Sequence, residues 1–215
     1  MSVAASIDFF EPIHDALQVN YFGVVRILDL AHECKRLQVM SHVSTCYGNS
    51  YMPDKTRIYE EIYPWKLDYE EFLAKVQAMN PQEAAEKLPE LLATPNDGSY
   101  PNTYCVTKNM AEQHLKRYQG DVKIVINRPT MIIMNLYEPF PGWVDTVSAA
   151  GCVAFPVLLG LSNYFQGVND VTMDPIPADV CSNSLLMQTV ASAKDLIPKL
   201  AVFACSSSAV NPCGL

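Results

Sequence analysis

Residues 101–108 read Pro-Asn-Thr-Tyr-Cys-Val-Thr-Lys, and the assignment of the fold begins from this stretch. Tyr104 and Lys108 lie four residues apart, so a helix that begins here places both side chains on one face. Gly120 stands where a glycine commonly closes a helix at its C-terminus. We therefore expect a helix over residues 104–118.

The face that holds Tyr104 and Lys108 continues through the apolar residues Ala111 and Leu115, which predicts that it packs against a sheet. A tyrosine beside a lysine on an inward face is a usable acid pair. The ammonium stabilises the phenolate and is expected to lower the tyrosine pKa from about 10. The same spacing also arises by chance, so the pair needs support from other residues.

Segments of strand and helix character alternate around this stretch. Predicted helices span residues 11–36 and 178–193, and predicted strands span 37–45, 122–126 and 200–205. Such alternation indicates an α/β fold with a mainly parallel sheet. Residues 51–101 differ by being rich in acids and prolines, and we read them as a surface insertion with two short helices near 69–79 and 82–93.

Three further polar residues stand at positions suited to chemistry. Ser44 and Thr45 follow the predicted strand 37–45, and the carboxyl ends of parallel strands are where open α/β sheets bind ligands. Asn20 lies on the inward stripe of the first helix, where a buried amide must find a partner such as a water or a backbone carbonyl. Hydroxyls that merely end a strand and a purely structural asparagine are the alternatives.

Composition excludes several classes of protein. The chain has 215 residues, 49% of them apolar, which excludes disorder and allows a sizeable core. Its net charge of −8 argues against a nucleic-acid partner, because phosphate binding needs a basic surface. No apolar run reaches the roughly 20 residues of a transmembrane segment. Seven scattered cysteines form neither a disulfide ladder nor a zinc pattern, so we expect no metal and a reduced, intracellular setting.

Glycine spacing gives a sharper exclusion. No two of the nine glycines lie closer than seven residues. A turn that cradles a pyrophosphate at a helix N-terminus needs two or three glycines within about six positions. This sequence has no such turn for a dinucleotide or a nucleoside triphosphate.

Taken together, Ser44 or Thr45, Tyr104 and Lys108, after a helix with Asn20, resemble the extended short-chain dehydrogenase/reductases. Within them the chain is similar to the fatty acyl-CoA reductases, and the run Glu138-Pro139-Phe140-Pro141-Gly142-Trp143 is the most specific match. The other matching segments are Ala4-Ala5-Ser6 with residues 9–12, His42-Val43-Ser44-Thr45, Glu60-Glu61-Ile62-Tyr63-Pro64, residues 101–108, Arg128-Pro129-Thr130, Ile176-Pro177-Ala178-Asp179, and Cys205 with Asn211-Pro212.

The resemblance implies a role for each matching residue. Tyr104 would donate a proton to a carbonyl oxygen, Lys108 would hold the nicotinamide ribose, and Thr45 or Ser44, with Thr45 preferred, would orient the carbonyl. Asn20 would anchor a proton-relay water. The residues expected to line the cofactor are Ala4, Ala5, Lys108, Arg128, Pro129 and Thr130.

The same resemblance implies NADPH as cofactor and a long-chain acyl-CoA as substrate, which is reduced through an aldehyde to a primary alcohol. It also implies association with the endoplasmic reticulum or the peroxisome. The family's glycine-rich turn is not in this sequence, so residues 1–215 are interpreted as an incomplete reductase domain with a partial, doubly wound, Rossmann-like sheet. We expect this chain alone to be inactive. The alternatives are a non-catalytic remnant and another extended reductase, such as a thioester reductase.

Overall fold

In a computed structural model of the chain, the structure describes residues 1–64, 68–93, 99–146, 155–161, 172–208, 210 and 213–214. Asn211 and Pro212, two of the residues behind the family resemblance, lie outside this set. The contacts divide the chain into two compact units. One comprises Met1–Arg128 with Thr189–Phe203, and the other comprises Pro129–Gln188 with Ala204–Leu215.

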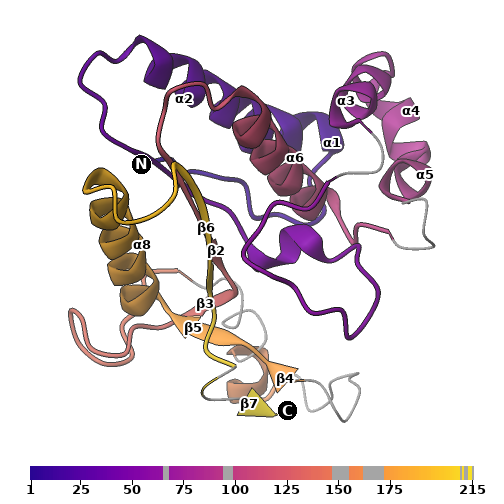
Figure 1. The fold of residues 1–215 in the computed structure, drawn as a ribbon. Coiled ribbons are helices and arrows are strands. Elements are labelled where there is room, and N and C mark those ends of the chain that lie inside the picture. The colour runs from indigo at the N-terminus through magenta and orange to yellow at the C-terminus, as the bar shows by residue number, and fades with distance from the viewer. Residues whose placement is uncertain are drawn as a thin grey trace. The chain divides into compact units, whose positions relative to one another are not determined.

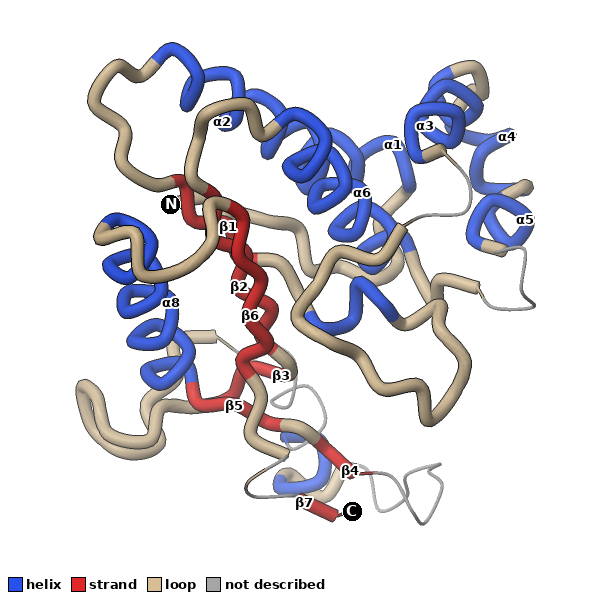
Figure 2. The backbone as a smooth tube through the Cα atoms, viewed as in Figure 1, coloured by secondary structure: helices blue, strands red, loops and turns tan. Residues whose placement is uncertain are grey.

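A three-stranded sheet in the order β1-β2-β6 is the centre of the fold. Its strands are β1 (Met40–Val43), β2 (Ile124–Pro129) and β6 (Leu200–Cys205), which lie side by side in Figure 2. β1 runs parallel to β2. Ile124 N donates to Lys199 O (2.8 Å) and Thr130 N to Cys205 O (3.1 Å), so β6 runs in the same direction as β2. The α/β class with a parallel sheet is therefore confirmed.

The predicted first helix is three elements in succession: α1 (Ile13–Ala16), the π-helical turn η1 (Leu17–Tyr21) and α2 (Phe22–Glu33). The helix predicted at residues 104–118 is α6 (Thr103–Tyr118), which lies beside α2 in Figure 1. Its start is capped by Asn102, whose side chain accepts a hydrogen bond from Cys105 N at 2.9 Å. An asparagine cap satisfies a backbone donor that the helix itself leaves unpaired.

Two apolar clusters fill the first unit. Ala111 and Leu115, each fully buried, pack with the residues of α2 and with Ile124 and Ile126 of β2, as the inward face of α6 predicts. The second cluster joins α1 and η1 to the segment predicted as a surface insertion. That segment forms α3 (Tyr69–Gln77), α4 (Pro81–Glu86) and α5 (Leu88–Leu92), and it contributes buried Tyr69, Phe72, Val76, Ala84, Leu92 and Tyr100.

The second unit holds short strands. β3 (Met131–Ile133) pairs in parallel with β5 (Pro175–Pro177), and β4 (Thr172–Met173) pairs antiparallel with β7 (Cys213–Gly214). Two further elements of the described residues are the 3-10 turn η2 (Cys46–Asn49), which follows β1 in the first unit, and α8 (Ala178–Ala193), which follows β5. Within the described ranges, no helix has both the length and the apolar character needed to cross a bilayer.

Candidate active site

The side chains of Tyr104 and Thr45 meet where β1 ends and α6 begins. Tyr104, the second residue of α6, is partly buried, whereas Thr45 is 2% exposed. Burial raises the pKa of Tyr104, and the hydrogen bond between its side chain and that of Thr45 partly offsets this rise. Thr45 Oγ1 also accepts a hydrogen bond from Tyr47 N at 3.3 Å, which fixes the threonine at the start of η2. Two hydroxyl groups are thus held together at the carboxyl end of a parallel strand.

Lys108 lies one turn further along α6 and is almost fully buried. Its Nζ donates a hydrogen bond to Val43 O at 2.6 Å, so the ammonium reaches the last residue of β1. Desolvation lowers the pKa of Lys108 to about 8, and the carboxylate of Glu112 opposes that shift. Lys108 is therefore still mostly protonated at neutral pH, although its pKa of about 8 lies close above that pH.

The expectation that Lys108 lowers the pKa of Tyr104 is wrong for this structure. The pKa of the phenol is raised, because burial dominates and the interaction that lowers it comes from Thr45. The four-residue spacing does place both side chains on one helix face. A shared face, however, does not ensure that the ammonium and the phenol oxygen are close, and here the ammonium is directed to Val43 O.

Ser44 differs from its neighbour Thr45. Its backbone N–H donates to Asn127 O at 2.7 Å, and its side chain is 2% exposed. Within the described part of the chain, Ser44 Oγ has no hydrogen-bond partner. Adjacent residues of an extended segment point to opposite sides, which accounts for the contact of Thr45 alone with Tyr104. Of the two hydroxyls left open by the sequence, only that of Thr45 bonds to the tyrosine.

Asn20 is buried in the π-helical turn and uses its whole amide on protein groups. Its Nδ2 donates to Ser6 O (3.1 Å) and to Thr107 Oγ1 (3.2 Å), and its Oδ1 accepts from Ser6 N (2.8 Å). Thr107 belongs to α6, between Tyr104 and Lys108. Asn20 therefore fastens the N-terminal loop to the helix of the candidate site, and both of its amide hydrogens have protein acceptors. Single π turns of this kind occur frequently at functional sites.

The N-terminal loop borders Tyr104. Ser2 forms a parallel bridge with His42, beside β1, and the chain then continues as a loop in which Ala4 is exposed and Ala5 partly exposed. Further along, the ring of Phe9 lies 5.5 Å from the ring of Tyr104, centroid to centroid. The aromatic side chain of Phe9 thus lies beside the tyrosine, in the same loop as the small residues Ala4 and Ala5.

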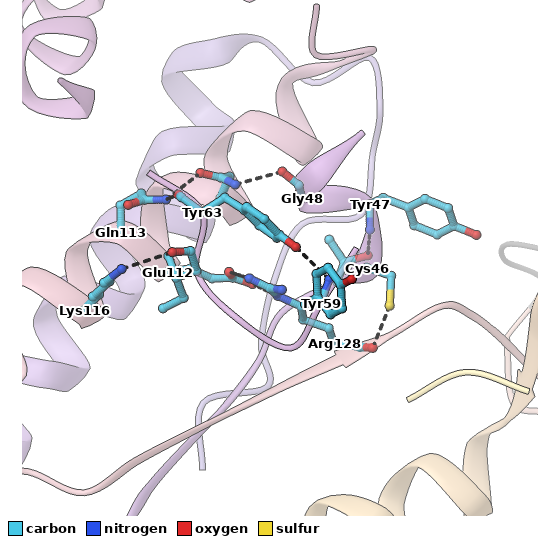
Figure 3. A network of polar contacts seen from close by, with 12 residues as sticks. Cys46, Tyr47, Gly48, Tyr59, Tyr63, Glu112, Gln113, Lys116 and Arg128 are labelled. Atoms are coloured by element: carbon cyan, nitrogen blue, oxygen red, sulfur yellow. Dashed lines mark hydrogen bonds and ion pairs between the residues drawn. The ribbon is translucent and has the colours of Figure 1, made fainter. Parts of the chain in front are cut away.

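Arg128, predicted to line a cofactor, has its guanidinium group in a buried ion pair. Arg128 Nε donates to Glu112 Oε1 at 3.0 Å, and a second nitrogen donates to Oε2, as Figure 3 shows. The next two predicted cofactor residues belong to the second unit. There Pro129 is buried, and Thr130 donates from both its backbone N and its Oγ1 to Cys205 O.

Two buried residues near the site were missed in the sequence. Glu112 follows Lys108 by four residues, as Lys108 follows Tyr104, and this repeated spacing could have indicated that Glu112 lies on the same inward helix face. His42 precedes the hydroxyls on β1, is 1% exposed, and has Nδ1 3.3 Å from Ser2 Oγ. Desolvation, and to a lesser degree the charge of Lys108, lowers the pKa of His42 well below its usual value, so its ring is neutral. No cluster of potential metal ligands occurs among the described residues.

A parallel α/β sheet with a tyrosine, a threonine hydroxyl and a buried lysine at its carboxyl edge defines a domain of the extended short-chain dehydrogenase/reductase class. A family model of NAD-binding domains described as male sterility protein matches residues 1–185. The chain belongs to this family.

The curated relatives carry the name expected from the resemblance. Fatty acyl-CoA reductase 1 of Xenopus laevis is 30% identical over 209 residues, which is 97% of this chain and 39% of that protein. Fatty acyl-CoA reductase 8 of Arabidopsis thaliana is 32% identical over 204 residues, covering 86% of this chain and 41% of that protein. The chain thus spans about two fifths of the length of these relatives.

Solved structures support the fold alone, because their identity is low. The terminal R domain of the myxalamid PKS-NRPS pathway has a TM-score of 0.59 at 17% identity, over 93% of this chain and 40% of that chain. UDP-glucuronic acid 4-epimerase from Bacillus cereus, solved in complex with NAD, also has a TM-score of 0.59 at 17% identity, over 96% and 53% of the two chains.

Proposed function

We propose that residues 1–215 are the reductase part of a protein that reduces a long-chain fatty acyl-CoA with NADPH to a fatty alcohol. The hydrogen bond between Thr45 and Tyr104, at the end of a parallel strand, is the observation that supports this most. It joins a proton donor to a second hydroxyl that can bind the same carbonyl oxygen. The names of the curated relatives supply the substrate class.

Tyr104 acts as the general acid in this proposal. Its raised pKa keeps the phenol protonated at neutral pH, so the proton is available when negative charge develops on the carbonyl oxygen. Thr45 is bonded to the tyrosine in the free protein, and once a carbonyl is bound its single hydroxyl hydrogen donates to that carbonyl oxygen instead. Lys108, still mostly charged at neutral pH, has its ammonium on Val43 O one turn away from Tyr104, so its role in this proposal is to hold the nicotinamide ribose. The nicotinamide, when bound, supplies the hydride.

The residues of this chain suit the nicotinamide-ribose end of the cofactor better than the pyrophosphate. Lys108 Nζ has one hydrogen bond to Val43 O and two further N–H groups, which suits contact with ribose hydroxyls. Ala4 and Ala5 offer small side chains in the loop that borders Tyr104. Because the guanidinium of Arg128 is paired with Glu112, any contact of Arg128 with the cofactor would come from its backbone. The glycines of this sequence are too widely spaced to form the turn that binds a pyrophosphate at a helix N-terminus.

The proposal is tested by assaying the gene product that contains residues 1–215 with a long-chain acyl-CoA and NADPH. NADPH oxidation is followed by absorbance, and aldehyde and alcohol are detected by mass spectrometry. We expect alcohol, two NADPH consumed for each alcohol formed, and loss of both signals in Tyr104→Phe. A folded gene product that forms neither product would favour a non-catalytic remnant and overturn the proposal.

The proposal includes a place of action inside the cell, at the endoplasmic reticulum or the peroxisome. Imaging of the tagged gene product against markers of both organelles tests this part separately from catalysis. Signal confined to any other compartment would contradict it.

A further inference from the structure

Two cysteines of the second unit, Cys181 and Cys205, lie together although they come from different elements. Cys181 is the fourth residue of α8, and Cys205 is the last residue of β6. Both are buried and pack with Ile176 of β5 in one small core cluster. Both are present as free thiols. A helix start and a strand end thus bring two sulfur atoms into the same part of the core.

Hydrogen bonds hold the backbone segments of the two cysteines to each other. Asp174, which lies between β4 and β5, accepts from Ser207 N at 2.8 Å, and Ser207 follows Cys205 by two residues. Ser207 Oγ also donates to Pro175 O, in β5, at 2.6 Å. Because α8 begins directly after β5, the chain around Cys205 is fixed next to the helix turn that carries Cys181.

The two thiol groups are hydrogen-bonded to each other. The bond from Cys181 holds the pKa of the Cys205 thiol below its ordinary value, against the opposing effect of burial, and Ser184 adds a second hydrogen bond. A hydrogen bond lowers the pKa of a thiol only when the partner is the donor, so the S–H of Cys181 points to the Cys205 sulfur. Two apposed thiols, one of them more acidic, are the arrangement from which a disulfide forms.

We propose that Cys181 and Cys205 are a redox modification site, a dithiol that a peroxide converts into a disulfide joining the start of α8 to the end of β6. The Cys205 thiolate attacks one peroxide oxygen, the O–O bond breaks, hydroxide leaves, and Cys205 becomes a sulfenic acid. The Cys181 sulfur then attacks the Cys205 sulfur, the S–O bond breaks, and the hydroxyl group leaves as water with the proton of Cys181. The two thiols are oxidised by two electrons in total, and the peroxide is reduced to two waters once the first hydroxide takes up a proton.

Burial determines which oxidant can reach the pair. Cys181 is 7% exposed and Cys205 6% exposed, so a small uncharged peroxide should reach them more readily than a bulky disulfide reagent. The reaction needs neither the substrate nor the cofactor of the proposed reductase. An inactive gene product would therefore refute the proposed function and leave this inference standing.

The test is treatment of the 215-residue chain with hydrogen peroxide, alkylation of the remaining thiols, and peptide mass spectrometry without reductant. Circular dichroism before treatment confirms that the chain is folded. We expect a linked peptide pair that contains Cys181 and Cys205, is lighter by two hydrogen atoms than the two reduced peptides together, and is separated by dithiothreitol. Equal alkylation of both cysteines before and after peroxide, or pairing of either one with a different cysteine, would overturn the proposal.

Single replacements separate the roles of the two thiols. Cys181→Ser should leave Cys205 as a sulfenic acid that dimedone traps, whereas Cys205→Ser should leave Cys181 reduced, because the more acidic thiol is gone. Cys34→Ser is the matched control, since Cys34 is exposed and its loss should leave the linked pair unchanged. More trapping at Cys181 in the one variant than at Cys205 in the other would contradict the proposed order of attack. The wild-type peptide map decides the proposal even where a variant fails to fold.

Discussion

Thr45, the second residue after β1, and Tyr104, the second residue of α6, are joined by a hydrogen bond between their side chains. The strand end is itself held by Lys108, whose Nζ donates to Val43 O. Strand and helix are thus connected twice within one helical turn. A carbonyl oxygen placed beside Tyr104 would therefore meet two hydroxyls whose separation the fold controls.

Replacing Tyr104 with phenylalanine should lower turnover by about 10²- to 10⁴-fold, because it removes the general acid and leaves the ring packing intact. The measurement is NADPH oxidation by the gene product, with the far-ultraviolet circular dichroism and thermal midpoint of the variant as folding controls. Retention of more than about a tenth of wild-type turnover would contradict the assignment of the acid.

The two adjacent hydroxyls should differ in importance. Thr45→Ala removes the hydrogen bond to Tyr104 and should reduce turnover by at least about tenfold, with a rise in the tyrosine pKa. Ser44→Ala is the matched control, because Ser44 Oγ is buried without a partner among the described residues. The turnover numbers of the two variants decide the matter. A larger loss at Ser44 would reverse the assignment.

The pH dependence of stability should report on Lys108. Its pKa is lowered to about 8 from 10.5, so between these values the unfolded chain holds a proton that the folded chain has released. Stability therefore rises with pH across this window, by an amount on the order of 3 kcal/mol. Urea unfolding of wild type and Lys108→Met is measured at several pH values. The unfolding free energy of the wild type, relative to that of Lys108→Met, should become larger as the pH rises toward 10.5. Lys87→Met, at an exposed position, serves as the control.

Loss of the Asn20 amide should destabilise the first unit. Asn20→Ala leaves the backbone of Ser6 and the hydroxyl of Thr107 without this partner, which should cost about 1–3 kcal/mol in unfolding free energy. Faster hydrogen exchange at the Ser6 amide should accompany the loss. Gln18→Ala, at an exposed position of the same π turn, should change neither quantity much. Equal effects of the two variants would show that the turn, and not the amide, matters.

The elements that the sequence predicted well are those with long, clear patterns. α8 and β6 occupy the predicted residues, because one begins directly after Pro177 and the other is a continuous apolar run. The strand predicted over 37–45 is shorter, since Leu37 is 42% exposed and Thr45 caps η2. The two- and three-residue strands of the second unit are too short for any periodicity to reveal them.

The sequence could indicate candidate site residues but not their electrostatics. Spacing and position at a strand end select Tyr104, Lys108 and the two hydroxyls of Ser44 and Thr45 as candidates, and the choice of Thr45 comes from the family resemblance; their roles stay predictions. The direction of the pKa shift of Tyr104 could not be predicted, because it depends on burial that only the packed structure defines. Glu112 was missed because a glutamate on a helix ordinarily faces water, whereas here Arg128, from a distant strand, makes its burial tolerable.

The π-helical turn at Leu17–Tyr21 has a consequence for insertions and deletions. A wider turn accommodates one more residue than a regular α-helix would over the same length, so removing Val19 would allow α1 and α2 to join as one regular helix. Because the wide turn absorbs the extra residue, α1 would keep the face that it presents to the core after this deletion, and Ile13, now 3% exposed, would stay buried. A one-residue deletion within the regular helix α2 would instead rotate every preceding residue by about 100° around the helix axis and take Ile13 out of the core. The first helical segment therefore accommodates the loss of one residue at the π turn and not in α2.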